Sequence, residues 1–280
     1  MPFAAGFRAA MLALSLACMP AGTPVFADDE QPLVDTALLV SVDVSNSVDE
    51  HRYKLQMEGI AEALEDKGVQ DAIVGGPAGG ILFGMVTWAD RPSFVMPWVR
   101  ISSKEEAAAV AKKVRKLQLQ SGEFTCMTRM MRSVNDKIVP QIPAKAARIV
   151  VDVSGDGPEN CNAEEQIETV RDELVQSGVT LNGLPINEGD PAAPVAGSKV
   201  TLEEWFKTHV MGGTGSFVLP ANGYADFGRA MRQKFVIEIS GRPAPEKFSA
   251  KPSIDKRLVE VQGLVEPLGA VPALEVPKLR

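Results

Sequence analysis

The stretch Thr36–Val42, with the sequence TALLVSV, is followed at once by Asp43–Ser47, with the sequence DVSNS. A continuous run of apolar and β-branched residues is the pattern of a strand that is buried on both faces, as in a parallel sheet. The polar residues that follow it would stand at the carboxyl end of that strand, where open α/β sheets bind their ligands. This stretch therefore predicts both the class of fold and the place of the functional site.

Strand and helix signals alternate along the rest of the chain. Five further segments have strand character: Ile81–Trp88, Ser93–Val99, Arg148–Val153, Val179–Leu184 and Gly215–Leu219. The second of these contains a proline, which cannot donate to a central ladder, so we expect it at an edge. The alternation predicts an α/β fold: a doubly wound, mostly parallel six-stranded sheet with helices on both faces and one antiparallel edge strand.

Helix signals stand between the predicted strands. Ser47 and Glu50 have the spacing of a capping box ahead of a one-sided helix. Ser102 or Ser103 is expected to cap a second helix, which has acidic residues in its first turn and basic residues in its last. Later helices are expected at Cys126–Ile138, Asn162–Ser177, Leu202–Val210 and from Tyr224 onward.

Residues 1–27 have the pattern of a signal peptide, with Arg8, the apolar run Ala9–Met19 and small residues up to Ala27. We expect cleavage after Ala27 and a periplasmic or secreted protein. No membrane insertion is expected after cleavage, because the run is shorter than the roughly 20 residues that span a bilayer. Ser15 occupies the position where lipoprotein signals have Leu, so we do not expect lipid anchoring at Cys18.

The mature chain is predicted to form one domain over residues 34–240, followed by a Pro-rich tail over residues 241–280. The tail lacks a core of its own, and we expect it to be disordered. A net charge of −7 argues against nucleic acid as the main partner, because no basic excess neutralises phosphates. With only two His in the chain and no H-E-x-x-H pattern, any metal must be held by oxygen.

Polar side chains on three loops are expected to meet at one edge of the sheet. Asp43, Ser45 and Ser47 follow the first strand, Thr125 precedes a later helix, and Asp156 follows the strand ending at Val153. Carboxylates and hydroxyls are hard donors that suit Mg²⁺, which we expect, or Mn²⁺ or Ca²⁺. Two carboxylates only balance a divalent ion, so a carboxylate of a protein partner could complete its coordination.

The D-x-S-x-S loop, the later Thr and the later Asp, in this order, resemble the metal-ion-dependent adhesion site of the von Willebrand factor type A domain. The resemblance covers about residues 34–240 and is greatest to a bacterial secreted branch of unknown function, through the stretch Gly178–Pro185. It implies that Ser45, Ser47 and Thr125 contact the metal, while Asp43 and Asp156 act directly or through water.

The sequence departs from that family pattern in two places. Ser154 and Gly155 precede Asp156 where Thr is usual, and Thr125 is followed by Cys126, Met127 and Thr128 with no nearby Gly, which makes Thr128 a rival for the Thr role. Each part also has a purely structural explanation: an Asp can satisfy backbone donors at a strand end, and Asp-Gly is a turn signal. Asp152 lies inside an apolar strand, so we expect a buried hydrogen-bonding group there and not a ligand.

Cys126 and Cys161 flank the proposed metal loops and remain as a pair after signal cleavage. In an exported protein such a pair favours a disulfide, which would stabilise the fold by roughly 3 to 4 kcal/mol. The alternative is two buried thiols.

The leading functional hypothesis is a non-enzymatic module that presents the metal to an acidic group of another protein. The alternative is a metal-dependent hydrolase, which would need a general base such as Asp49, Glu50 or Glu123. No His lies near the loops and no G-x-S-x-G motif is present, so we expect no enzymatic activity. A third possibility is a degenerate domain that binds no metal.

Overall fold

The computed structural model describes residues 33–161 and 164–249. Its strands are Leu33–Val34 (β1), Thr36–Asp43 (β2), Ile81–Trp88 (β3), Pro92–Ile101 (β4), Lys145–Ala146 (β5), Ile149–Gly155 (β6) and Val179–Pro185 (β7). Its α-helices are Glu50–Glu65 (α1), Lys67–Val74 (α2), Lys104–Val114 (α3), Met127–Ser133 (α4), Ile167–Gln176 (α5), Leu202–His209 (α6) and Phe227–Ser240 (α7). A π-helical segment, Val134–Ile138, and a 3₁₀ turn, Val139–Gln141, continue α4, and a second 3₁₀ turn, Tyr224–Asp226, precedes α7.

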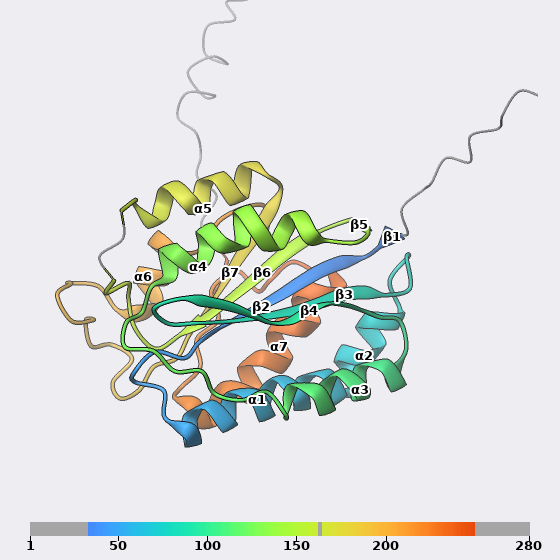
Figure 1. Cartoon of the computed structure of the whole chain (residues 1–280), viewed down its shortest axis with the longest axis horizontal. Helices are drawn as coiled ribbons and strands as arrows, with labels where there is room; N and C mark the ends of the chain where they lie inside the picture. Colours follow the sequence, from blue (N-terminus) through green and yellow to red (C-terminus); the bar gives the residue numbers. More distant parts are fainter. Residues whose placement is uncertain (1–32, 162–163, 250–280) are drawn as a thin grey trace, which may run out of the picture. The chain divides into compact units, whose positions relative to one another are not determined.

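The main sheet has the strand order β4-β3-β2-β6-β7, with β2 at its centre (Figure 1). Neighbouring strands run parallel except β3 and β4, which pair antiparallel at the edge. The short strands β1 and β5 form a separate parallel pair. The predicted α/β class, with a mostly parallel sheet and one antiparallel edge strand, is confirmed.

The main sheet has five strands, not the six predicted, because Gly215–Leu219 does not form a continuous ladder. This segment lies beside β7 and makes isolated bridges, one of which pairs Gly183 with Val218. Gly213 and Gly215 on its amino-terminal side have positive φ angles, and Pro220 after it has no N–H to donate. The apolar residues 217–219 are buried, but the strand predicted here is wrong, because the backbone around it does not sustain regular pairing.

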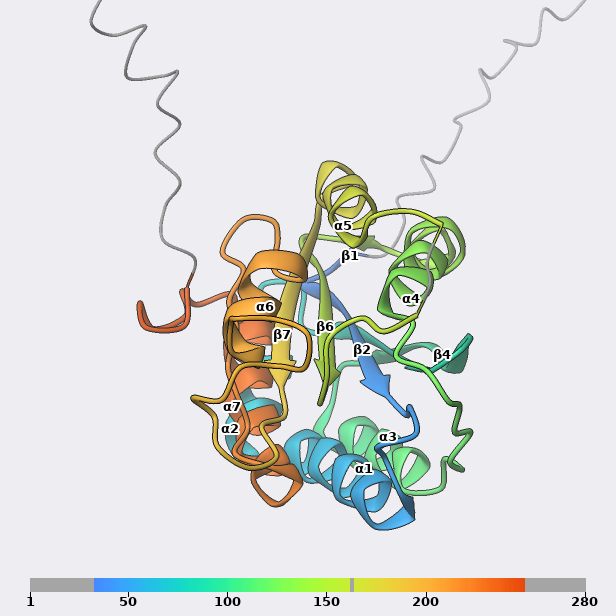
Figure 2. The ribbon, with the colours of Figure 1, turned by 90° about the vertical axis from the view of Figure 1, so that its left-hand side faces the viewer.

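Helices cover both faces of the sheet (Figure 2). On one face α1 packs against α3 and α7, and on the other α4 packs against α5. The central strand shows why both layers are needed, because Leu38 and Val40 join the core under α1 and α7, whereas Leu39 joins the core under α4 and α5. Every residue of β2 is buried, as its unbroken apolar run predicted.

The helix boundaries depart from the sequence predictions in three places. Asp49, not Ser47, caps α1, with its Oδ1 accepting from the backbone N of Arg52 at 2.8 Å. The helix α2 was not predicted; Asp66 caps it through a side chain that accepts from two backbone amides. The helix α5 begins at Ile167, and the predicted cap Asn162 lies outside the described residues.

The predicted signal peptide also lies outside the described residues, as does the tail from residue 250 onward. The first part of the tail contacts the domain, because the backbone N of Val218 donates to the carbonyl of Phe248 at 3.0 Å. Within the described ranges, no helix has both the length and the apolar character that a membrane span requires.

Candidate metal site

The five residues singled out in the sequence come together at the carboxyl edge of the sheet. Asp43 is the last residue of β2, Ser45 and Ser47 lie between β2 and α1, and Asp156 directly follows β6. Because β2 and β6 are adjacent parallel strands, their following loops leave the sheet side by side. Thr125 lies two residues before α4 and completes the group.

A chain of contacts links the side chains of this cluster. Thr125 Oγ1 donates to Ser45 Oγ at 3.3 Å, and the Ser45 and Ser47 hydroxyls lie 3.4 Å apart. Ser47 Oγ donates to Asp156 Oδ1 at 2.8 Å. Asp43 Oδ1 accepts from the backbone N of Ser45 at 2.8 Å, which turns the loop back over the end of β2. Three hydroxyls and two carboxylates therefore share one small region.

Asp43 is fully buried, and its second carboxylate oxygen, Oδ2, has no hydrogen-bond donor in the described part of the chain. Burial, and to a smaller extent the nearby charge of Asp156, raise the pKa of this carboxyl to about 7, although hydrogen bonds from Ser45 oppose the shift. Gly155 lies against the same oxygen, since a Cβ at that position would be 3.1 Å from Asp43 Oδ2. A buried carboxylate oxygen without a donor fits a bound cation, which would offset the cost of burying its charge.

The structure distinguishes the two rival threonines by their partners. Thr128 Oγ1 and the Thr128 backbone N both donate to Glu159 Oε2, at 3.1 and 2.7 Å. Thr125 instead points its hydroxyl at Ser45, and Asn160 Oδ1 accepts from its backbone N at 2.7 Å. Of the two, only Thr125 contacts the cluster, so the candidate set remains Asp43, Ser45, Ser47, Thr125 and Asp156.

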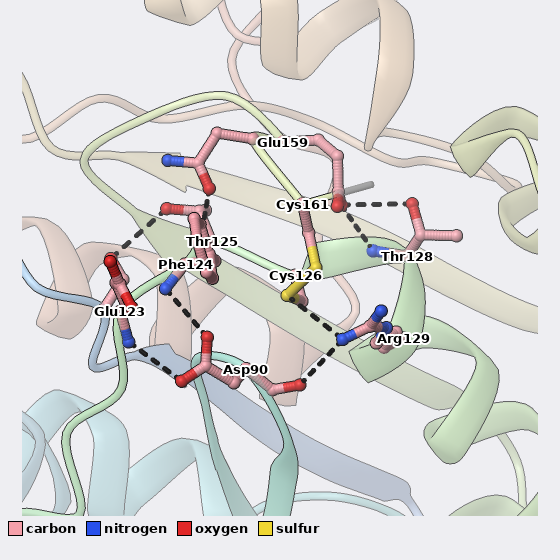
Figure 3. The surroundings of a disulfide bond; sticks show 11 residues. Asp90, Glu123, Phe124, Thr125, Cys126, Thr128, Arg129, Glu159 and Cys161 are labelled. Carbon is pink, nitrogen blue, oxygen red and sulfur yellow. Dashed lines mark hydrogen bonds between the residues drawn. A yellow bond between two sulfur atoms is a disulfide. The ribbon is translucent and has the colours of Figure 1, made fainter. Parts of the chain in front are cut away.

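Cys126 and Cys161 form a disulfide, as predicted, with a Cα–Cα distance of 4.8 Å. The bond joins the loop that carries Thr125 to the segment that follows Asp156 (Figure 3). Hydrogen bonds reinforce the same connection, because Asn160 N donates to the carbonyl of Thr125 at 3.2 Å. The disulfide therefore fixes the position of Thr125 relative to the loop after β6.

Tyr224 contacts the candidate site and was not identified from the sequence. Its hydroxyl donates to Asp156 Oδ2 at 3.0 Å, and its side chain is buried. Burial and the charges of Asp156 and Asp43 hold the pKa of this phenol above its usual value, so it remains a donor. Arg52 stacks over the ring at 5.3 Å and also contacts Glu188, which accepts from the backbone N of Tyr224.

No short sequence motif could identify Tyr224, because it lies 68 residues after Asp156 in the chain. The three carboxylates named as possible general bases lie elsewhere: Asp49 caps α1, Glu50 is exposed in the first turn of that helix, and Glu123 is exposed on the loop before Thr125. Among residues 33–161 and 164–249, no three or more His, Cys, Asp or Glu side chains form a group that could hold a metal. Any cation here would depend on the hydroxyls.

Solved structures with the same fold include proximal thread matrix protein 1 from the mussel byssus, with 19% identity and a TM-score of 0.54, in a form whose MIDAS motif is occupied by zinc. The match covers 75% of this chain and 49% of that one. A von Willebrand factor type A structure from Catenulispora acidiphila matches with 15% identity and a TM-score of 0.52, over 74% of this chain and 43% of that one. This chain thus spans about half the length of the structures it matches, or less.

The fold is therefore that of a von Willebrand factor type A domain, a mostly parallel sheet between two layers of helices. The chain belongs to the family described as "Protein of unknown function (DUF1194)", whose model matches residues 33–243. A comparison with curated proteins gave no match. Neither of the solved proteins named above is described as an enzyme.

Proposed function

We propose that this chain is an exported module that binds a divalent cation through Asp43, Ser45, Ser47, Thr125 and Asp156. The observation that carries the proposal is the buried Oδ2 of Asp43, which has no donor among the described residues, beside a second carboxylate and three hydroxyls. Oxygen donors of this kind suit Mg²⁺ first, with Mn²⁺ and Ca²⁺ as alternatives. The zinc in the MIDAS motif of the mussel protein supports a divalent cation at the corresponding place.

The ion would serve to hold a carboxylate of a protein partner. Asp43 and Asp156 together supply two negative charges, and the three hydroxyls supply none. A divalent ion held by such a set is only neutralised, so it can still accept an anionic oxygen from outside. When bound, the cation supplies an electrophilic position, and the side chains of this cluster hold and orient it.

Export of the chain is part of the proposal. The Cys126–Cys161 disulfide is typical of proteins in oxidising compartments. The amino-terminal pattern of residues 1–27 supports a periplasmic or secreted location in the same way.

Calorimetric titration with Mn²⁺ and Mg²⁺ tests the proposal directly. We expect one ion per chain for the wild type and no heat of binding for Asp43→Asn. Because Asn keeps the shape of Asp43 and removes a buried charge, the variant should fold at least as well as the wild type in the absence of metal. At a 100-fold excess of metal over Kd, the wild type should gain about 2.7 kcal/mol of stability.

Asp66→Asn is the matched control, since Asp66 caps α2 and contacts no residue of the cluster. It should lower stability slightly and leave metal binding intact. Absence of Mn²⁺ and Mg²⁺ binding by the wild type, or unchanged binding in Asp43→Asn, would refute the proposed metal site.

A further inference from the structure

A groove of about 580 Å³ lies beside the candidate metal site, along α4. Its lining includes Thr128, in the first turn of α4 and three residues after Thr125. One end of the groove therefore lies next to the loop that carries Thr125. The residues that line it with charged side chains are Arg91, Arg129, Arg132, Asp136, Lys137, Glu164 and Glu165. The groove is not part of the five-residue cluster.

The basic side chains of this groove differ in whether they have an acidic partner. Arg132 pairs with Glu165 and Asp136, at 2.6 and 3.6 Å, and also with Glu173. Among the described residues, no ion pair is formed by Arg91, Arg129 or Lys137. Glu164 is the acidic residue of the lining that does not pair with Arg132. All four of these side chains belong to exposed residues. In the part of the chain that the structure describes, the groove therefore presents three basic side chains without an ion pair against one such acid. The carboxylate of Asp90 lies near two of them: hydrogen bonds from two backbone amides, and to a smaller extent the charges of Arg129 and Arg91, lower its pKa.

Arg129 is held close to the metal loops by its contacts. Its Nη1 lies 3.4 Å from the carbonyl oxygen of Asp90 and 3.8 Å from Cys126 Sγ (Figure 3). The carboxylate of the same Asp90 accepts from the backbone N of Glu123 and of Phe124, at 2.9 and 3.0 Å. One short segment therefore positions both the arginine and the loop that leads to Thr125.

Phe124 adds an apolar element to this surface. It directly precedes Thr125, and 46% of its surface is exposed although its backbone is fixed by Asp90. An ordered, exposed aromatic ring beside a polar site is typical of interaction surfaces.

We propose that the groove formed by Arg91, Arg129 and α4, together with Phe124 on the loop before α4, binds an acidic segment of the partner. This inference rests on the proposed function: one carboxylate of the segment binds the metal, and a second pairs with Arg91 and Arg129. Phe124 packs against an apolar part of the same segment. The partner is thus a protein with at least two acidic side chains close together in an exposed stretch, which the basic groove attracts by charge complementarity.

Binding of a fluorescein-labelled decaglutamate peptide to the full chain, followed by anisotropy in excess Mg²⁺, tests this arrangement. We expect Mg²⁺-dependent binding by the wild type, and affinity about fivefold to tenfold lower for Arg91→Gln with Arg129→Gln. The dependence of affinity on salt should also become weaker. Lys112→Gln with Lys113→Gln, which removes the same charge from the exposed face of α3, should leave affinity unchanged.

The variants separate this inference from the proposed function. Mn²⁺ binding without peptide binding would show that the groove is not the docking surface and would leave the metal site intact. The same holds if the peptide binds the double arginine variant as tightly as it binds the wild type. If Mn²⁺ does not bind the wild type, the proposed function itself fails. Peptide binding that survives Asp43→Asn but not the double arginine change would overturn the two-point arrangement, because the groove would then act without the metal.

Discussion

Two pairs of carboxylates in this domain have different surroundings. Asp152 in β6 and Glu238 in α7 lie on either side of Lys234, whose Nζ is 3.3 Å from Asp152 Oδ1 and 3.1 Å from Glu238 Oε1. Asp43 and Asp156 contact hydroxyls and a backbone amide, and no Lys or Arg of the described ranges forms an ion pair with either. One pair has a cation supplied by the chain, and the other has none.

The presence or absence of an internal lysine indicates the role of each pair of carboxylates. Burial raises the pKa of Asp152 to about 8, with the charge of Glu238 adding to the effect and Lys234 opposing it. A fully enclosed cluster with its own cation can serve the fold alone. Asp152 is buried, as predicted, but among the described residues its carboxylate has an ion pair with Lys234 in place of the expected hydrogen bonds. The pair at the edge of the sheet lacks such compensation although Asp43 is as deeply buried, which is why an external cation fits there.

Removal of the internal cation should have the largest effect. Lys234→Met would leave Asp152 and Glu238 buried without a positive charge, and we expect a loss of about 3 to 5 kcal/mol in the free energy of unfolding by urea. Lys54→Met, on the exposed side of α1, should change stability by less than about 0.5 kcal/mol. A loss below about 1 kcal/mol for Lys234→Met would contradict a compensating role for this lysine.

The disulfide should matter to the edge cluster and not to the enclosed one. Cys126→Ser with Cys161→Ser is expected to cost about 3 to 4 kcal/mol of stability, since the bond closes a loop of 35 residues in the unfolded chain. Mn²⁺ affinity should fall as well, because Thr125 loses its connection to the loop after β6. Dithiothreitol should reproduce both effects in the wild type and change nothing in the variant; equal Mn²⁺ affinity with and without the bond would show that the site does not depend on it.

The enclosed pair should respond to pH. The folded-state pKa of Asp152, about 8, lies above its ordinary value of 3.8, so between these pH values the folded protein keeps a proton that the unfolded chain loses. Stability should therefore fall as pH rises through this window, by at most about 1.4 kcal/mol per pH unit. Asp152→Asn removes the titrating group. The free energy of unfolding by urea of this variant, relative to that of the wild type, should therefore rise from pH 5 to pH 8. If the free energies of unfolding of the wild type and of Asp152→Asn change equally with pH, the raised pKa of Asp152 is refuted.

The smallest expected effect is that of the tyrosine that orients Asp156. Tyr224→Phe keeps the ring under Arg52 but removes the donor to Asp156 Oδ2, so Mn²⁺ affinity should fall about tenfold with little change in the thermal midpoint. Tyr53→Phe is the matched control, because the buried Tyr53 hydroxyl has no hydrogen-bond partner among the described residues. Equal metal affinity in Tyr224→Phe and Tyr53→Phe would remove Tyr224 from the site.

Much of the architecture could be predicted from periodicity. The strands β2, β3, β4, β6 and β7 all lie within a few residues of the predicted ranges, because apolar runs between turn residues are a local signal. The prediction of a sixth strand at Gly215–Leu219 was wrong, because the neighbouring glycines and a proline allow only isolated bridges there. The cap of α1 also differed, because Asp49 and Ser47 are both good caps and the loop uses Ser47 to contact Asp156.

The sequence by itself determined the class of fold and the edge at which the polar loops meet. Burial on both faces requires helices on both sides of the sheet, and parallel strands bring the loops after β2 and β6 to one edge. Only the tertiary structure showed that Thr125 and not Thr128 contacts Ser45, that Tyr224 donates to Asp156, and that Lys234 lies between two carboxylates. These contacts join residues far apart in the chain, and how helices and loops pack on the sheet decides which of them meet.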